Sequence, residues 1–456
     1  MKQSRKAKGL LETLLVIGLI LIIPLFFAIK TAANKQTVQS TATAIRIPAS
    51  PPVTIPSISS PAVKAKQPPQ CTFPLAQPTT VESVPEEYTF SEPQVVLSHP
   101  DNLYNIVEWL PDNQQVLMTE DQHNTREMER DKFLRQSIEL YNPETGESKV
   151  YAIRHYIDEP PSWQPGLNAV VYPAMNFMGI DENTHGPKFT RQVWVSYGNP
   201  DTAQMLADKL PQFSLALKPD GSEMIYLSDK KISKRNSSLK DIPSVSFDSA
   251  QWDYAKGRRS ELPLSYRMAW QPGTSLIFLY GDGFRRWDGY TFILNADTGQ
   301  VCELNLGGWA AKAHWSSDGR YLAIIRAEMS PSPVNLTELV VLDIVTGNLY
   351  TIRVTPQEIE GRHYVDDFVW APDNLHLLAI GSATPFQNTG QADIAGLYLV
   401  DFTSGQSVNL LSTYKFYANM SKNNLAWSPD GSKLLVRCPT MEEDRVCFIS
   451  VQRTQQ

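Results

Sequence analysis

A short pattern recurs seven times along the chain: an apolar strand that usually ends in Trp, a turn rich in Pro, Asp, Gly or Asn, and a second apolar strand. In such a turn Pro fixes φ at the first corner, Asp caps local amides, and Gly or Asn accepts a positive φ at the exit. Each copy therefore predicts a β-hairpin. The aligned anchor residues, 45 to 57 positions apart, are Trp109, Trp163, Leu217, Trp270, Trp315, Trp370 and Trp427.

A second turn follows most copies of the pattern. Four copies carry it clearly, at Gly146, Gly299, Gly347 and Gly405, and looser versions stand near Gly198 and Gly257. Two hairpins in roughly 50 residues make a four-stranded antiparallel meander, and seven such units in succession predict an all-β, seven-bladed β-propeller. The Trp anchors are expected to fill the wedge between blades, where burial of the ring contributes roughly 3 to 5 kcal/mol against Ala.

The last copy contains only three strands, near Leu425, Leu434 and Val446–Val451. The segment Gln94–Ser98 reads as an additional strand before the first copy. We expect this strand to complete blade seven, so that the two ends of the domain close the ring.

The stretch WSPDG at Trp427–Gly431, together with its six relatives, resembles the TolB-like, WD-like propeller repeat over about residues 94–452. This resemblance implies a propeller that makes protein contacts at the cell envelope. TolB proteins carry an α/β domain before the propeller, whereas this chain has a Pro-rich stretch at that place.

The N-terminus predicts a membrane tether. Basic residues in the first eight positions precede the apolar run Leu14–Ile29, and this order places the N-terminus in the cytoplasm and the rest of the chain outside. Residues 1–30 are thus expected to form a single-pass transmembrane anchor at the cell membrane. Cleavage as a signal sequence stays open, because Thr31–Ala33 are small. Residues 31–92 are rich in Pro, Ser and Thr, which predicts a linker, and residues 93–453 are the predicted propeller.

Charge and cysteine content limit the functional classes. The net charge of −7 argues against nucleic acid as a partner. Four cysteines, Cys71, Cys302, Cys438 and Cys447, lack zinc-ligand spacing. Cys438 and Cys447 would lie on neighbouring strands of a hairpin, where a disulfide is geometrically possible, which leaves Cys71 and Cys302 as the second pair. Four free thiols are the alternative.

The meander also predicts where function lies. The two kinds of short turn share one face of the disc, so the long connections gather on the opposite face, where partners are expected to bind. The candidate binding residues on these connections are Tyr156, Arg285, Arg286, Trp287, Trp309, Tyr364 and Tyr417. Aromatic and Arg side chains are typical of binding hot spots, although packing between loops explains them as well.

The sequence offers little for catalysis. It has no nucleophile elbow, and its loop histidines, His155, His185 and His363, lack metal-ligand spacing. We therefore predict no catalytic residues, no cofactor and no bound metal, and a non-catalytic module that binds a protein or peptide partner. The alternative is a propeller-fold hydrolase of the glycosidase or lactonase type, with its site at the mouth of the central channel.

Overall fold

The computed structural model describes residues 70–72, 86–99, 102–122, 135–155, 159–180, 187–210, 215–228, 231–246, 266–281, 291–306, 308–327, 337–355, 361–385, 394–410, 424–440 and 443–455. All of them belong to one compact unit, Lys64–Gln456. The predicted anchor, residues 1–30, lies outside this part of the chain. None of the described segments is a helix of the length and apolarity that a membrane crossing needs.

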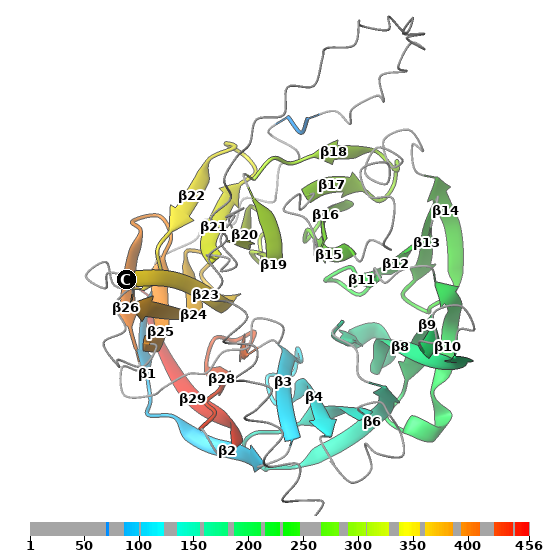
Figure 1. Cartoon of the computed structure of the whole chain (residues 1–456), viewed down its shortest axis with the longest axis horizontal. Helices are drawn as coiled ribbons and strands as arrows, with labels where there is room; N and C mark the ends of the chain where they lie inside the picture. The colour runs from blue at the N-terminus through cyan, green and yellow to red at the C-terminus, as the bar shows by residue number, and fades with distance from the viewer. Residues whose placement is uncertain are drawn as a thin grey trace, which may run out of the picture. The chain divides into compact units, whose positions relative to one another are not determined.

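The described residues form seven antiparallel sheets, and Figure 1 shows them arranged around a common centre. The strands of blades one to three are, in chain order, β3 (Asn102–Trp109), β4 (Val116–Gln122), β5 (Arg135–Tyr141) and β6 (Ser148–His155); β7 (Ser162–Gln164), β8 (Ala169–Ile180), β9 (Pro187–Ser196) and β10 (Gln204–Leu210); β11 (Leu215–Leu217), β12 (Glu223–Ser228), β13 (Lys231–Asn236) and β14 (Asp241–Ser246).

Blades four to six repeat this meander. Their strands are β15 (Tyr266–Trp270), β16 (Leu276–Gly281), β17 (Thr291–Asn295) and β18 (Val301–Glu303); β19 (Trp309–Trp315), β20 (Tyr321–Ala327), β21 (Thr337–Asp343) and β22 (Leu349–Ile352); β23 (Gly361–Trp370), β24 (His376–Pro385), β25 (Ile394–Asp401) and β26 (Gln406–Asn409). The first strand of each of these blades lies toward the centre of the ring and the fourth forms its rim (Figure 1). The predicted seven-bladed propeller of four-stranded blades is confirmed.

Blade seven combines both ends of the domain. It contains β27 (Leu425–Trp427), β28 (Lys433–Arg437) and the long β29 (Asp444–Gln455). The outer edge of β29 pairs first with β2 (Gln94–His99) and then with β1 (Glu86–Phe90). The predicted closing strand is therefore confirmed. The sheet also begins earlier than the expected boundary at residue 93, because β29 continues beyond β2 and its exposed edge takes up β1.

The hairpin turns have the expected backbone conformation. A residue with positive φ ends each of the seven first turns; Gly or Asn fills this position, with φ between 50° and 77°, at Asn113, Asn168, Gly221, Gly273, Gly319, Asn374 and Gly431. The second turn of blade three differs from the prediction near Gly257. It lies at Asn236–Lys240, where Leu239 takes a φ of 59° and the Asn236 side chain accepts hydrogen bonds from the amides of Ser238 and Lys240. The Asn side chain supplies the turn there, so the expected Gly is not needed.

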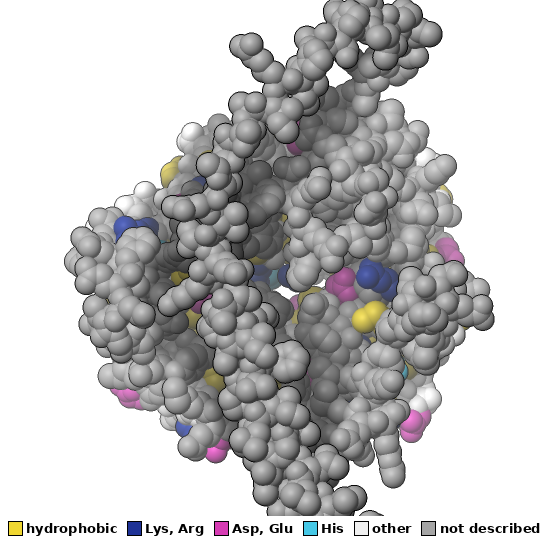
Figure 2. Space-filling view, in the orientation of Figure 1, with side chains coloured by type: hydrophobic (Ala, Val, Ile, Leu, Met, Phe, Trp, Pro, Cys, Tyr) yellow, Lys and Arg dark blue, Asp and Glu magenta, His cyan; other side chains and the backbone are white. Residues whose placement is uncertain are grey.

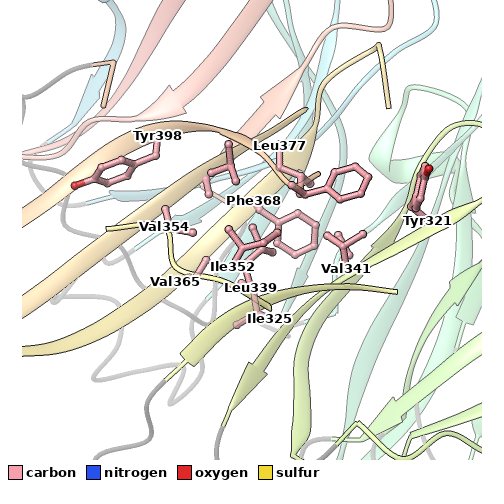
Figure 3. Packing of buried hydrophobic residues seen from close by; sticks show 14 residues of the cluster. Tyr321, Ile325, Leu339, Val341, Ile352, Val354, Val365, Phe368, Leu377 and Tyr398 are labelled. Atoms are coloured by element: carbon pink, nitrogen blue, oxygen red, sulfur yellow. The ribbon is translucent and has the colours of Figure 1, made fainter. Parts of the chain in front are cut away.

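The hydrophobic core is divided among the seven interfaces between consecutive blades. One interior cluster lies at each interface, as between blades five and six, where Leu339 and Ile352 lie together and Tyr398 lies nearer Val354 (Figure 3). Stability is thus distributed around the ring, as expected when each blade buries its faces only against its two neighbours.

The anchor Trp residues lie in these interface clusters and also join blades through hydrogen bonds. The indole N–H groups of Trp109, Trp315 and Trp370 donate to main-chain oxygens of the preceding blade, those of Ala426, Ala269 and His314, at 2.9 to 3.1 Å. Those of Trp270 and Trp427 instead donate to carbonyls of their own turns. The indole ring of each anchor Trp therefore fills the gap between two blades. In three copies its hydrogen bond also fixes the position of one blade relative to the other.

Both possible cysteine pairs form disulfides. Cys438 and Cys447 connect β28 and β29 inside blade seven. Cys71 is joined to Cys302 on β18, the rim strand of blade four, and the amide of Cys71 also donates to the main-chain oxygen of Glu303 at 3.0 Å. Part of the predicted linker is therefore held against the propeller, because this disulfide and its neighbouring hydrogen bond attach it to a strand edge.

Candidate functional site

The short turns make up one face of the disc, which we call the turn face. Here neighbouring turns are joined across blades by ion pairs, such as Lys433 with Glu144 at 2.8 Å, and by hydrogen bonds between neutral groups. The side chain of Gln271 donates to the oxygen of Gly319 at 2.7 Å, and the amide of Ser317 donates to the side chain of Asn374 at 2.8 Å. The amide of Asp430 likewise donates to the Asn113 side chain at 3.0 Å. The polar groups of these turns are therefore used in contacts between neighbouring blades.

We call the opposite face, with the connections between second and third strands and between blades, the loop face. A buried network of charged and polar side chains joins consecutive blades there. Asp367 on β23, which is fully buried, forms an ion pair with Lys312 on β19 and accepts a hydrogen bond from the amide of Asn424. The Asn424 side chain accepts a hydrogen bond from Arg437, and Arg437 pairs with Asp444 at 2.8 Å.

The network also reaches blade one. Asp444 accepts a hydrogen bond of 2.7 Å from the amide of Tyr104 on β3. Four consecutive blades, five to seven and one, are thus linked across the point where the ring closes. Buried charges require such pairing, because an isolated charge in a protein interior is strongly destabilising.

Sequence reasoning missed this network, although a signal for it exists. Lys312, Asp367 and Asn424 each stand three residues before the anchor Trp of their blade, and Arg267 has the same place in blade four. Aligning the repeats by this position, as well as by the turn, identifies a polar column at the start of the inner strands. Its partners Arg437 and Asp444 carry no equivalent signal.

The inner strands also place ionisable groups beside the centre of the ring, and Figure 2 shows basic, acidic and histidine side chains around the central opening. Glu108 on β3 accepts a hydrogen bond of 2.7 Å from the amide of Trp163 in blade two, yet burial raises the pKa of Glu108 to about 7. Desolvation by the surrounding protein and, to a smaller extent, the charge of Lys312 lower the pKa of His314 on β19.

Asp366 lies next to the network. Its side chain accepts a hydrogen bond of 3.0 Å from Ser382, and burial, with the smaller influence of Asp367, raises its pKa to about 6. The predicted alternative function places its site at the mouth of the central channel. Asp366 is an ionisable group in the middle of the inner strand β23, whereas Glu108 directly precedes Trp109 at the turn-face end of β3.

A groove of about 480 Å³ lies between blades one and two. The end of β6 forms one wall with Ile153, Arg154 and His155. Strands β8 and β9 form the other wall, with Tyr172 and Trp194. The groove borders also include the exposed Arg135 at the start of β5 and Asp201 in the short 3₁₀ helix η2 (Pro200–Thr202).

The interior of the groove is held rigidly by hydrogen bonds. The buried guanidinium of Arg154 donates to the side chain of Gln136 at 2.7 Å, to the oxygen of Glu159 at 2.8 Å and to the oxygen of Pro173. On the opposite wall, Trp194 donates to Gln192 at 3.0 Å. Burial raises the pKa of Tyr172 to about 12, so its hydroxyl stays protonated.

Apolar side chains extend the groove onto the rim. Ile153 is 55% exposed, and Met205 on the neighbouring rim strand β10 is 48% exposed. A groove with aromatic walls, polar groups in fixed positions and apolar residues at its border is typical of a binding site. The groove is therefore the candidate functional site among the described residues.

Most of the sequence-predicted binding residues lie outside the described part of the chain: Tyr156, Arg285, Arg286, Trp287 and Tyr417. The backbone of Trp309 begins β19, and Tyr364 is half-buried on β23, so both lie at the loop-face ends of inner strands. His155 borders the groove, whereas the side chain of His363 contacts Thr355 and Arg353. His185 is not described.

The groove itself was not predicted. Its polar residues come from strands that are far apart in sequence, and the only local signal is the run Ile153–His155, which interrupts the apolar alternation of a rim strand. In the segments that the structure describes, no three His, Cys, Asp or Glu side chains are arranged to hold a metal ion.

Comparison with known proteins finds several solved structures of low similarity and identifies no family. The β-propeller domain of the Trilobed protease from Pyrococcus furiosus matches with a TM-score of 0.45 and 11% identity, over 81% of this chain and 95% of that one. The WD40 domain of Pan2 from Neurospora crassa matches with a TM-score of 0.35 and 13% identity, over 61% and 71%.

A putative 6-phosphogluconolactonase from Bacteroides fragilis matches with a TM-score of 0.38 and 15% identity, over 79% of this chain and 90% of that one. No protein-family model matches the sequence, and no curated protein is similar to it. The sheet topology shows that the chain is a seven-bladed β-propeller, and the comparisons assign it to no family.

Proposed function

We propose that this protein is a membrane-tethered, extracytoplasmic propeller of the TolB-like, WD-like kind that binds a protein or peptide partner without catalysing a reaction. The observation that carries the proposal is the groove between blades one and two. Its walls present Tyr172, Trp194 and Ile153 beside cationic groups, and aromatic and Arg side chains contribute most strongly to protein interfaces.

Two further observations support the location. The apolar run Leu14–Ile29 after a basic N-terminus is typical of a membrane anchor. The two disulfides are of the kind that persists in oxidising compartments outside the cytoplasm. Alkylation of thiols in whole cells without reductant is therefore expected to label none of the four cysteines. Labelling of all four would contradict the extracytoplasmic location.

The binding function is tested by photo-crosslinking in native membranes. A photoreactive amino acid at Ile153 of the full-length chain is expected to give an adduct of one defined mass, because Ile153 borders the groove. The matched control carries the same group at Val408, which is 60% exposed on the rim strand β26 of blade six. The same adducts at both positions, or none at Ile153, would contradict the proposal.

A hydrolase of the glycosidase or lactonase type is the second candidate, and Asp366 favours it. A carboxyl group whose pKa is raised to about 6 is suited to proton transfer near neutral pH. If this function is correct, Asp366→Asn abolishes hydrolysis of a panel of chromogenic esters, lactones and glycosides, whereas Asp430→Asn on the turn face does not. Absence of activity from the unmodified protein removes the second candidate.

A further inference from the structure

The rim strand β6 differs in charge from the other rim strands. It carries Lys149, Arg154 and His155 and no acidic residue, whereas each other described rim strand has at most one basic residue. Lys149 is exposed and its amino group lies 5.0 Å from the centre of the Tyr151 ring. The formal charge of β6 is thus positive in a chain with a net charge of −7, and Lys149 is its exposed cation, since Arg154 is buried.

The same strand offers apolar surface and an edge that pairs with no further strand, although the main-chain oxygen of Tyr151 accepts a hydrogen bond from the hydroxyl of Ser196 in blade two. Val150 and Ile153 are 37% and 55% exposed, and the groove runs beside Ile153. Within the described residues, β6 ends its sheet and pairs only with β5. An exposed strand edge with apolar side chains is a template for another strand.

This protein already uses such an edge elsewhere. At blade four, Gln70 forms a parallel bridge with Glu303 of the rim strand β18, beside the Cys71–Cys302 disulfide. A segment from outside the meander is therefore taken up at a rim edge. The edge of β6 has the same position in blade one.

We propose that β6 and the groove beside it accept an extended acidic segment of a partner protein, which adds as a strand to the edge of blade one. Its main-chain groups pair with β6, its carboxylates lie near Lys149, Arg135 and His155, and its apolar side chains contact Ile153 and Trp194. Strand addition supplies affinity through main-chain hydrogen bonds, and the alternating side chains supply specificity. This inference rests on the proposed binding function and specifies the class of its partner.

The test measures binding of fluorescein-labelled peptides to the purified full-length protein by fluorescence anisotropy at low salt. The first peptide has about eight residues in which Glu and Val alternate, which matches the roughly 25 Å of the eight-residue strand β6. A second peptide has Lys in place of Glu. A third has the first sequence with alternate amides N-methylated, so that it cannot pair with a strand.

The acidic peptide is expected to bind at least about tenfold more tightly than either other peptide. Lys149→Glu is expected to weaken its binding about tenfold, Lys149→Gln less, and the control Lys240→Glu, an exposed position in a turn of blade three, not at all. Equal binding of the Lys peptide overturns the acidic specificity, and equal binding of the N-methylated peptide overturns strand addition.

A further outcome separates edge protection from binding. If Lys149 only keeps the edge from self-association, Lys149→Glu leaves peptide binding unchanged, and the inference is overturned. A defined adduct at Ile153 without preference for the acidic peptide overturns this inference alone. Absence of both the adduct and peptide binding overturns the proposed function as well.

Discussion

On the turn face, adjacent blades are joined by neutral hydrogen bonds between short turns, such as that from Gln271 to Gly319, and by partly exposed ion pairs, such as Lys433 with Glu144 at 2.8 Å. On the loop face, the blades around the closure point are joined by buried charges, with Arg437 and Asp444 only 6% and 3% exposed in their side chains. Neutral turn contacts are numerous and each contributes little. Buried charges are few, and removal of one partner leaves the other unpaired in the interior.

One carboxyl group on each face shows a pKa shift, and the two shifts have opposite directions. Burial alone would raise the pKa of Asp430 in its turn, but hydrogen bonds from Ser432 and Ser428 outweigh it and hold the pKa below its usual value. Burial raises that of Asp366 on the loop face to about 6. The turn therefore stabilises the ionised form of Asp430. At Asp366 on the loop face, burial makes ionisation unfavourable.

The largest expected effect comes from breaking the buried pair on the loop face. Arg437→Met should lower the free energy of unfolding by about 3 to 5 kcal/mol, because Asp444 then remains buried without its cation. The matched control is Arg445→Met, since Arg445 pairs with Glu443 at 2.9 Å but both side chains are about one-third exposed. The control should cost less than about 1 kcal/mol. Urea unfolding that shows equal losses would contradict the comparison.

The second prediction concerns pH. Because the pKa of Asp366 is raised in the folded state, the stability it confers is lost as pH rises from about 4 to about 6. Asp366→Asn should therefore gain roughly 3 kcal/mol over the unmodified protein at pH 7.5 and little at pH 4. Asp430→Asn should have the opposite effect and lose stability at neutral pH. The lowered pKa of Asp430 means that its ionised form stabilises the fold at pH values above its ordinary pKa of 3.8. Thermal unfolding at both pH values distinguishes the two.

The smallest expected effect tests the turn face. Asn374 has a φ of 57°, and its side chain accepts hydrogen bonds from the amide and the hydroxyl of Ser317 in the preceding blade. Asn374→Gly keeps the turn but removes both contacts, which should cost about 1 to 2 kcal/mol. Asn168→Gly, at a φ of 50°, is the control for the backbone alone. A loss at Asn168 as large as that at Asn374 would show that the cross-blade contacts contribute nothing.

Much of the fold was predictable because its turns are local. A Pro, an Asp and a Gly or Asn at fixed positions determine a turn without help from distant residues, and seven such turns at a regular spacing imply seven blades. The role of Gln94–Ser98 as the closing strand could be predicted by counting strands, because the last repeat contains only three. Leu239 shows the limit, because a turn held by an Asn side chain does not contain the Gly for which the pattern was searched.

The sequence by itself therefore determined the number of blades, the positions of most turns and the way in which the ring closes. Only the tertiary structure decided which polar residues meet. Lys312, Asp367, Asn424, Arg437 and Asp444 come together from three blades, and the groove forms where β6 faces β8 and β9 across a blade boundary. The reason is physical: turn chemistry depends on consecutive residues, whereas a buried charge network and a groove depend on the register and packing of strands that are distant in sequence.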